Sequence, residues 1–307
     1  MLPLVITAVT GTVLLDDGAG AGSPVAALVG GNASYGVQRT SKSGVPLWRD
    51  EGCLEMAYDT TSVTPEIADV LDRAFATWNT ATAQCGGVAF SSYRAPDLAT
   101  TNDGLSTVHV RTDRWCRPAT AGQPEQCYAP EASAVTRLIF IDDPTDPDDG
   151  KILEADMELN AVNFALLLPG QAAPVGSIAV DLQAVVTHEA GHVLGLAHDC
   201  GTGTEPWPMD HAGNLVPACT DAAPQVTAAT MFFQINPGET GARTVEAGDT
   251  TGACILVRDL VCEPRIEAGC SAAPAHARGR RGGELVIAAG LGFGLVVRRR
   301  RKRRRGR

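Results

Sequence analysis

Three histidines, a glutamate and a glycine between residues 188 and 199 constrain this chain more than any other feature. His188 and His192 are four residues apart, and the apolar run before them predicts a helix, so both imidazoles should point the same way. Gly195 can adopt the positive φ that ends a helix, which would let His198 reach the same point from the other side. The spacing therefore predicts three imidazoles converging on one metal ion.

Three neutral histidines leave one coordination position open, which is the arrangement of a catalytic zinc site. Such an ion lowers the pKa of a bound water to about 7. Glu189 is adjacent to one ligand but points elsewhere, which suits a general base. We therefore predict one catalytic Zn²⁺ held by His188, His192 and His198, with Glu189 as the catalytic residue in peptide hydrolysis. A solvated helix with incidental histidines is the alternative, but a chance match to five fixed positions is on the order of 10⁻⁵ in a chain this long.

This motif resembles that of the metzincin zinc peptidases, and the surrounding chain is most similar to the matrixin branch. The resemblance implies a methionine in a tight turn below the metal, and residues 229–232 resemble that turn. Met231 would then form an apolar floor under the imidazoles without binding the metal. Met209 is the competitor, but residues 243–246 and 249–252 resemble the start of the terminal matrixin helix and so favour Met231. Phe233 occupies the position at which some metzincins carry a tyrosine, so no tyrosine ligand is expected.

Three departures limit the assignment to a branch. Asp199 stands where matrixins usually have serine, and an aspartate there is more like the adamalysin branch. The chain has six histidines, too few for a second, structural zinc of the matrixin type. Finally, no segment matches the cysteine-containing prosegment that covers the zinc in many matrixins.

The resemblance implies an α+β, metzincin-like catalytic domain, with a twisted mixed sheet, two long helices and an irregular, disulfide-linked lower part that contains Met231. Residues 64–66 (Thr-Pro-Glu) form a helix start, and apolar residues follow at helical spacing as far as Trp78, which we expect in the core. Residues 47–48 and 54–58 before this helix predict the first strand.

Three later segments have the pattern of strands. Residues 106–111 alternate, with His109 as a surface or internally hydrogen-bonded residue outside the site. Residues 135–141 should form the edge strand of the cleft, to which an extended peptide could add. Residues 153–160 have a period of two, and we expect the polar face, from Glu154 to Asn160, to point to solvent or to a cation.

Two loops carry open alternatives. The five aspartates between residues 142 and 149 could bind Ca²⁺ through hard oxygen ligands, or could form an acidic solvated turn. The resemblance implies that the segment between His198 and Met231 shapes the pocket just after the scissile bond, with Trp207 and Leu215 as candidates for its wall. A loop aromatic packed on the core is the alternative for Trp207.

Cysteine usage predicts an oxidising compartment. Eight cysteines lie between residues 53 and 262, and the ninth, Cys270, stands apart. Local spacing favours the pairs 116–127, 200–219 and 254–262, which leaves 53 for 85, although eight cysteines allow 105 connectivities.

Both ends of the chain are consistent with export. Residues 2–15 are apolar and of signal-peptide length, so residues 1–34 are predicted to be a signal peptide or leader, with a short buried strand as the alternative. Residues 35–262 would form the catalytic domain, and 263–284 a linker. Residues 285–307 comprise a 13-residue apolar run and an arginine-rich block. This end resembles the myxobacterial C-terminal sorting signal, in which the cysteine, here Cys270, is the processing position.

The charge distribution bears on the partners. Residues 278–307 hold 12 of the 25 basic residues and one acid, so the preceding part has 13 basic and 34 acidic residues, a net charge of −21. That acidity argues against nucleic acid and anionic membrane as partners. We expect a secreted or surface-attached monomer with a protein or peptide substrate, contacting membrane only through the C-terminal segment. The alternative function is a non-catalytic zinc-containing adhesin or binding module.

Overall fold

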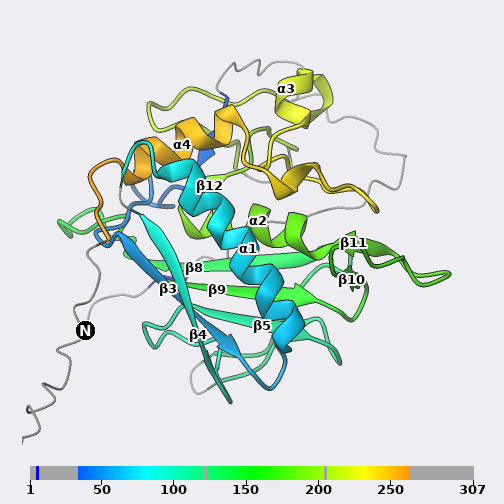
Figure 1. The fold of residues 1–307 in the computed structure, drawn as a ribbon. Coiled ribbons are helices and arrows are strands. Elements are labelled where there is room, and N and C mark those ends of the chain that lie inside the picture. The colour runs from blue at the N-terminus through cyan, green and yellow to red at the C-terminus, as the bar shows by residue number, and fades with distance from the viewer. Residues whose placement is uncertain (1–4, 7–33, 87, 121–122, 204–205, 263–307) are drawn as a thin grey trace, which may run out of the picture. The chain divides into compact units, whose positions relative to one another are not determined.

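A mixed sheet with two long helices on one face is the framework of the computed structural model, which describes residues 5–6, 34–86, 88–120, 123–203 and 206–262 (Figure 1). Five strands lie in the order β8-β9-β5-β3-β4, and the two-residue β1 pairs with the end of β8. The strands β3, β4, β5 and β9 run parallel, and β8 is antiparallel to β9. Their bounds are Val5–Ile6 (β1), Cys53–Asp59 (β3), Ala89–Ala95 (β4), Thr107–Arg111 (β5), Ala134–Phe140 (β8) and Ile152–Asn160 (β9).

The two helices begin where local sequence predicts. Helix α1 (Pro65–Thr82) starts with Thr64 as its N-cap, whose side chain accepts a hydrogen bond from the Ile67 N–H at 3.4 Å. Helix α2 (Leu182–Val193) is capped in the same way by Asp181, which accepts from the Ala184 N–H at 2.9 Å. Both pack into the core, and the expected combination of helices with a mixed sheet is confirmed.

The polar face of β9 departs from expectation. Glu154, Asp156, Glu158 and Asn160 are all buried, whereas Leu153, expected on the apolar face, is 40% exposed. The side chains that cover the polar face also pair with it: Arg137 donates to Asp156 at 2.6 Å, and Arg111 donates to Glu158 at 2.5 Å. The prediction that this face points to solvent was wrong, because the chain between β4 and β8 folds back over it.

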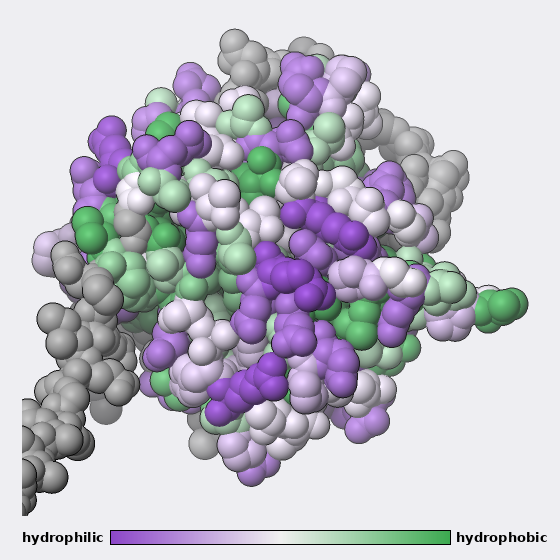
Figure 2. All heavy atoms as spheres, in the orientation of Figure 1, coloured by the Kyte–Doolittle hydropathy of each residue, from purple (hydrophilic) through white to green (hydrophobic). Residues whose placement is uncertain are grey.

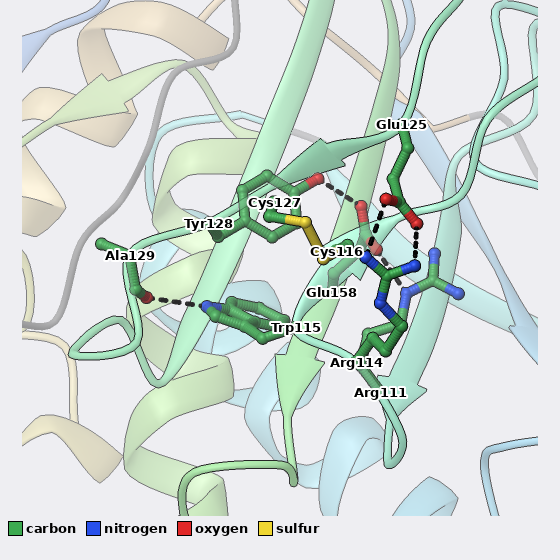
Figure 3. Close-up of a disulfide and its surroundings, with 9 residues drawn as sticks. All are labelled: Arg111, Arg114, Trp115, Cys116, Glu125, Cys127, Tyr128, Ala129 and Glu158. Carbon is green, nitrogen blue, oxygen red and sulfur yellow. Dashed lines mark hydrogen bonds and ion pairs between the residues drawn. A yellow bond between two sulfur atoms is a disulfide. The ribbon is translucent and has the colours of Figure 1, made fainter.

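A small hairpin forms part of that cover (Figure 3). Strands β6 (Cys116–Arg117) and β7 (Gln126–Cys127) are joined by a disulfide, and Tyr128 beside them donates to Glu158 at 2.6 Å. The Trp115 ring packs against Tyr128 and donates to the Ala129 carbonyl at 2.9 Å. The hairpin thus adds a second hydrogen-bond donor and apolar cover to Glu158, whose other carboxylate oxygen is bonded to Arg111.

The chain after α2 is mostly irregular, and together with its helix α4 it lies above α1 and α2 in Figure 1. Its regular pieces are β12 (Leu196–Ala197), η2 (Cys219–Asp221), α3 (Pro224–Thr227), η3 (Gly241–Arg243) and α4 (Ala247–Val257). Strand β12 pairs antiparallel with β2 (Gly36–Val37) from the start of the described chain. Before α2, β10 (Ala165–Leu167) pairs parallel with β11 (Ala179–Asp181).

Four disulfides close the domain, and two of the expected pairs are present. Cys116–Cys127 and Cys200–Cys219 are confirmed, but the other two pairs were wrong, because the bonds are Cys53–Cys262 and Cys85–Cys254. Helix α4 contacts α1, which places its cysteine beside the end of α1, and the segment after α4 returns to the start of β3. Nearness in sequence failed as a guide because the segment after α4 packs against the start of β3, and α4 packs against the end of α1.

The described surface is largely hydrophilic on the face that carries α1, and an apolar loop projects between β10 and β11 (Figure 2). Among the described residues, no helix is long and apolar enough to cross a membrane. All of the described residues belong to one compact unit. Apart from β1 and Ser34, the predicted leader lies outside the described residues, as do the linker with Cys270, the apolar run and the basic tail.

Candidate metal centre

Three buried imidazoles meet at the end of α2. His188 and His192 lie one helical turn apart, and their ring centroids are 4.9 Å from each other. The His198 ring centroid is 5.3 Å from that of His188 and 5.1 Å from that of His192. One ligand atom from each residue lies within 4.8 Å of the other two, so the three could hold a metal ion. The predicted convergence of these histidines is confirmed.

The turn between α2 and His198 is formed by Gly195, as expected. Gly195 has φ +100°, a conformation that favours glycine, and its N–H donates to the His192 carbonyl at 2.9 Å. The helix therefore ends directly after the second imidazole. Strand β12 then carries the chain back past the helix end to the third.

Backbone carbonyls hold the Nδ1 side of the His188 and His192 rings. The Nδ1 atom of His188 lies 2.6 Å from the Thr230 carbonyl oxygen, and that of His192 lies 2.8 Å from the Leu196 carbonyl oxygen. Since a carbonyl only accepts, Nδ1 carries the proton in both rings. Their Nε2 atoms are buried and have no hydrogen-bond partner, and they are the atoms free to bind a metal.

Burial also keeps these rings neutral. It lowers the pKa of His188 to about 3 and that of His192 well below the ordinary value of 6.5. Neighbouring imidazoles lower both pKa values further. A neutral imidazole is the form that binds a metal, so the donor set fits a borderline ion such as zinc.

Glu189 is buried beside the imidazoles on the same helix. Its Oε2 accepts a hydrogen bond from the Thr136 hydroxyl of β8 at 2.6 Å, while its Oε1 is buried without a hydrogen-bond partner. Burial raises the pKa of Glu189 to about 8, and the hydrogen bond from Thr136 opposes that rise. The glutamate therefore has one fixed oxygen and one oxygen available to a bound molecule.

Met231 packs directly against α2. A Cβ built on Gly191, between the first two histidines, would overlap the Met231 sulfur and come within 2.9 Å of the Trp78 ring. Trp78 is fully buried and donates to the Thr187 carbonyl at 2.7 Å, as expected of a core residue. Met209 instead lies beside β2, whose Val37 N–H donates to its carbonyl. The methionine beneath the helix is thus Met231.

The turn that carries Met231 is held by Asp249 of α4. This buried carboxylate accepts from the Thr230 N–H at 2.7 Å and from the Met231 N–H at 3.3 Å. Asp199 lies nearby and is also buried, and its side-chain oxygens have no hydrogen-bond partner. Burial, with a contribution from Asp249, raises the pKa of Asp199 to about 8. The next residues along the turn, Phe232 and Phe233, pack edge to face.

The third histidine is supported by the start of the described chain. Gly36 of β2 pairs with Ala197, and a Cβ at this glycine would overlap the His198 carbonyl oxygen. The Val37 N–H donates to the Met209 carbonyl, so β2 lies between the third ligand and the loop around residue 209. Sequence analysis did not identify this role, because a two-residue strand has no detectable periodicity.

The other predicted candidates lie outside the centre. His109 is buried and bonded to Asp59 and Thr107, which confirms a satisfied structural residue. Trp207 packs on Gly201 and donates to the Val216 carbonyl at 2.8 Å, which matches the loop-packing alternative. Leu215 is half-buried, and its part in a pocket stays a prediction.

Several carboxylates of the acidic loop, residues 142–149, accept hydrogen bonds from the loop itself or from the neighbouring residues 41 and 42. Asp143 accepts from Thr145, Asp149 accepts from the Asp143 N–H, and Asp142 accepts from Ser41 and Lys42. These aspartates are not among the groups of described residues that converge as a metal site. Calcium binding stays a prediction. The second convergent group, Cys116, Glu125 and Cys127, contains the hairpin disulfide, and Arg114 pairs with its glutamate (Figure 3).

No protein-family model matches this chain, and no curated protein is similar to it.

Proposed function

We propose that this chain is a zinc-dependent endopeptidase that acts in an oxidising, extracellular environment. One observation carries the proposal: three buried imidazoles converge beside a buried glutamate that keeps one oxygen free of protein partners. A bare metal-storage or structural site has no need of a buried carboxylate with one oxygen left without a hydrogen-bond partner, because burying a polar atom in this way is destabilising. The four disulfides indicate an oxidising compartment, and secretion or surface attachment is proposed on that basis.

The residues that would hold Zn²⁺ are His188, His192 and His198, the first two through Nε2. Zinc bound there would supply a Lewis acid that polarises the scissile carbonyl and lowers the pKa of a water molecule. Glu189 takes a proton from the attacking water at Oε1 and delivers it to the leaving amine nitrogen.

The substrate reaches the site in extended form along β8. Among the described residues this strand is the edge of the five-stranded sheet, apart from its end at Ile139 and Phe140, which pairs with β1. A peptide added beside β8 would be held by main-chain hydrogen bonds, which any sequence can make. The proposal is therefore an endopeptidase whose side-chain preference arises from pockets rather than from the edge strand.

The test uses the full, oxidised chain loaded with Zn²⁺ and an unstructured casein-type protein. We expect hydrolysis that a chelator abolishes, a fall of roughly 10²–10⁴-fold in Glu189→Ala with metal content retained, and loss of metal in His198→Ala. Glu66→Ala, on the exposed side of α1, is the matched control and should cleave as the wild type does. Zinc binding with no cleavage by the wild type would favour the adhesin or binding module instead.

A further inference from the structure

The general base proposed for the candidate centre, Glu189, is tied to the edge strand through Thr136. Thr136 of β8 donates to Glu189 Oε2 at 2.6 Å, and its oxygen lies 3.3 Å from the Glu189 carbonyl. A hydroxyl has one proton, and the shorter contact to the carboxylate takes it. Thr136 and Glu189 are both fully buried, so water does not compete for this bond.

The position of Thr136 is set by a rigid element. Thr136 pairs with Met157 of β9, and its neighbour Arg137 points to the opposite face of the sheet, where it binds Asp156. Because successive side chains of a strand point to opposite faces, the side chain of Thr136 points toward α2. A buried hydroxyl is destabilising unless it is hydrogen-bonded, and valine would fill the same space on a strand without that need. The hydroxyl at this position has the glutamate as its partner.

The consequence for the glutamate is an asymmetric carboxylate. Thr136 holds Oε2, while Oε1 is buried with no hydrogen-bond partner. With one oxygen anchored, rotation of the carboxylate is restricted, and the other oxygen keeps one direction relative to the three imidazoles. We propose that Thr136 is a positioning residue for Glu189, which fixes the oxygen that handles the proton. This inference rests on the proposed peptidase function.

The kinetic test compares Thr136→Val, which removes the hydroxyl at nearly constant volume, with Thr136→Ser, which keeps it. We expect kcat to fall about 10- to 100-fold in Thr136→Val with KM within about twofold, and most of the loss to be restored in Thr136→Ser. Thr82→Val is the matched control, because Thr82 is equally buried and donates to the Trp78 carbonyl of α1 at 2.9 Å. Its kcat should equal that of the wild type.

A binding measurement tests the same bond without turnover. A peptide hydroxamate, whose N–H and O–H can donate to a carboxylate beside a metal, is titrated calorimetrically into the zinc-loaded chain. Thr136→Val should weaken its binding about 10-fold in the wild-type background and leave it unchanged in the Glu189→Ala background. Metal content should stay at that of the wild type in all variants.

Two results would overturn the inference: Thr136→Val with wild-type kcat and hydroxamate affinity, or the same loss of affinity with and without Glu189. Equal losses in Thr136→Val and Thr136→Ser would also count against it, because they would point to packing rather than to the hydroxyl. If the wild type cleaves no peptide, the proposed function fails, whereas the hydroxamate cycle still decides whether the two residues are coupled.

Discussion

Gly36→Ala should weaken metal binding although residue 36 contacts no metal and lies more than 150 positions before the third ligand. A Cβ on Gly36 would overlap the His198 carbonyl oxygen and lie 3.2 Å from both Ala197 and Pro208. The overlap involves backbone, so no side chain can rotate away to relieve it. The added Cβ would lie 2.3 Å from that oxygen, so strands β2 and β12 would have to separate by on the order of 1 Å to restore normal packing.

That separation is large compared with what a metal site tolerates, because ligand distances hold to about 0.2 Å. We therefore expect the zinc affinity of Gly36→Ala to fall about 10- to 100-fold, the range seen when groups that support a ligand are removed. Overpacking should lower the free energy of unfolding by about 1–3 kcal/mol, offset by about 0.4–1 kcal/mol from the restricted unfolded chain.

The assay is competition for Zn²⁺ against a chromophoric chelator, with unfolding followed in the metal-free and metal-loaded states. Gly241→Ala is the matched control: a Cβ at Gly241 has no neighbour within 4 Å, and its φ is not positive. It should bind zinc as the wild type does. A Gly36→Ala protein with zinc affinity and stability equal to those of the control would refute the contact between β2 and the third ligand.

Three further predictions concern the core, the disulfides and pH. Gly191→Ala should be destabilising alone but less so beside Met231→Ala, because the truncated methionine leaves room for the added methyl group; additive effects in denaturant unfolding would contradict that contact. Non-reducing peptide mapping should recover the pairs Cys53–Cys262 and Cys85–Cys254, and finding 53–85 with 254–262 would disprove the closure of the fold. Burial beside Asp156 raises the pKa of Glu154 above its ordinary 4.5. Above pH 4.5 the folded protein therefore binds more protons than the unfolded chain, and the free energy of unfolding should fall as the pH rises from 4.5 through the raised pKa. Glu154→Gln should flatten this decline in unfolding experiments between pH 4 and pH 9, and an unchanged slope would exclude the residue as its source.

Local sequence was enough to predict the parts of the site that lie within one element or one turn. The four-residue spacing of His188 and His192 fixes their common face on any helix, and Gly195 fixes where that helix ends. The cap of α1 and the alternation of β9 were equally readable. These features depend on neighbours within about five positions, and the chain carries that information locally.

Tertiary structure alone decided the contacts between distant segments. Thr136 meets Glu189 across 53 positions, Gly36 of β2 meets His198, and two disulfides join the region around α4 to Cys53 and Cys85. The polar face of β9 looked solvent-exposed because alternation shows which residues share a face but not what covers that face. Register and long-range closure depend on how whole elements pack, and no pattern in a single stretch of sequence records that packing.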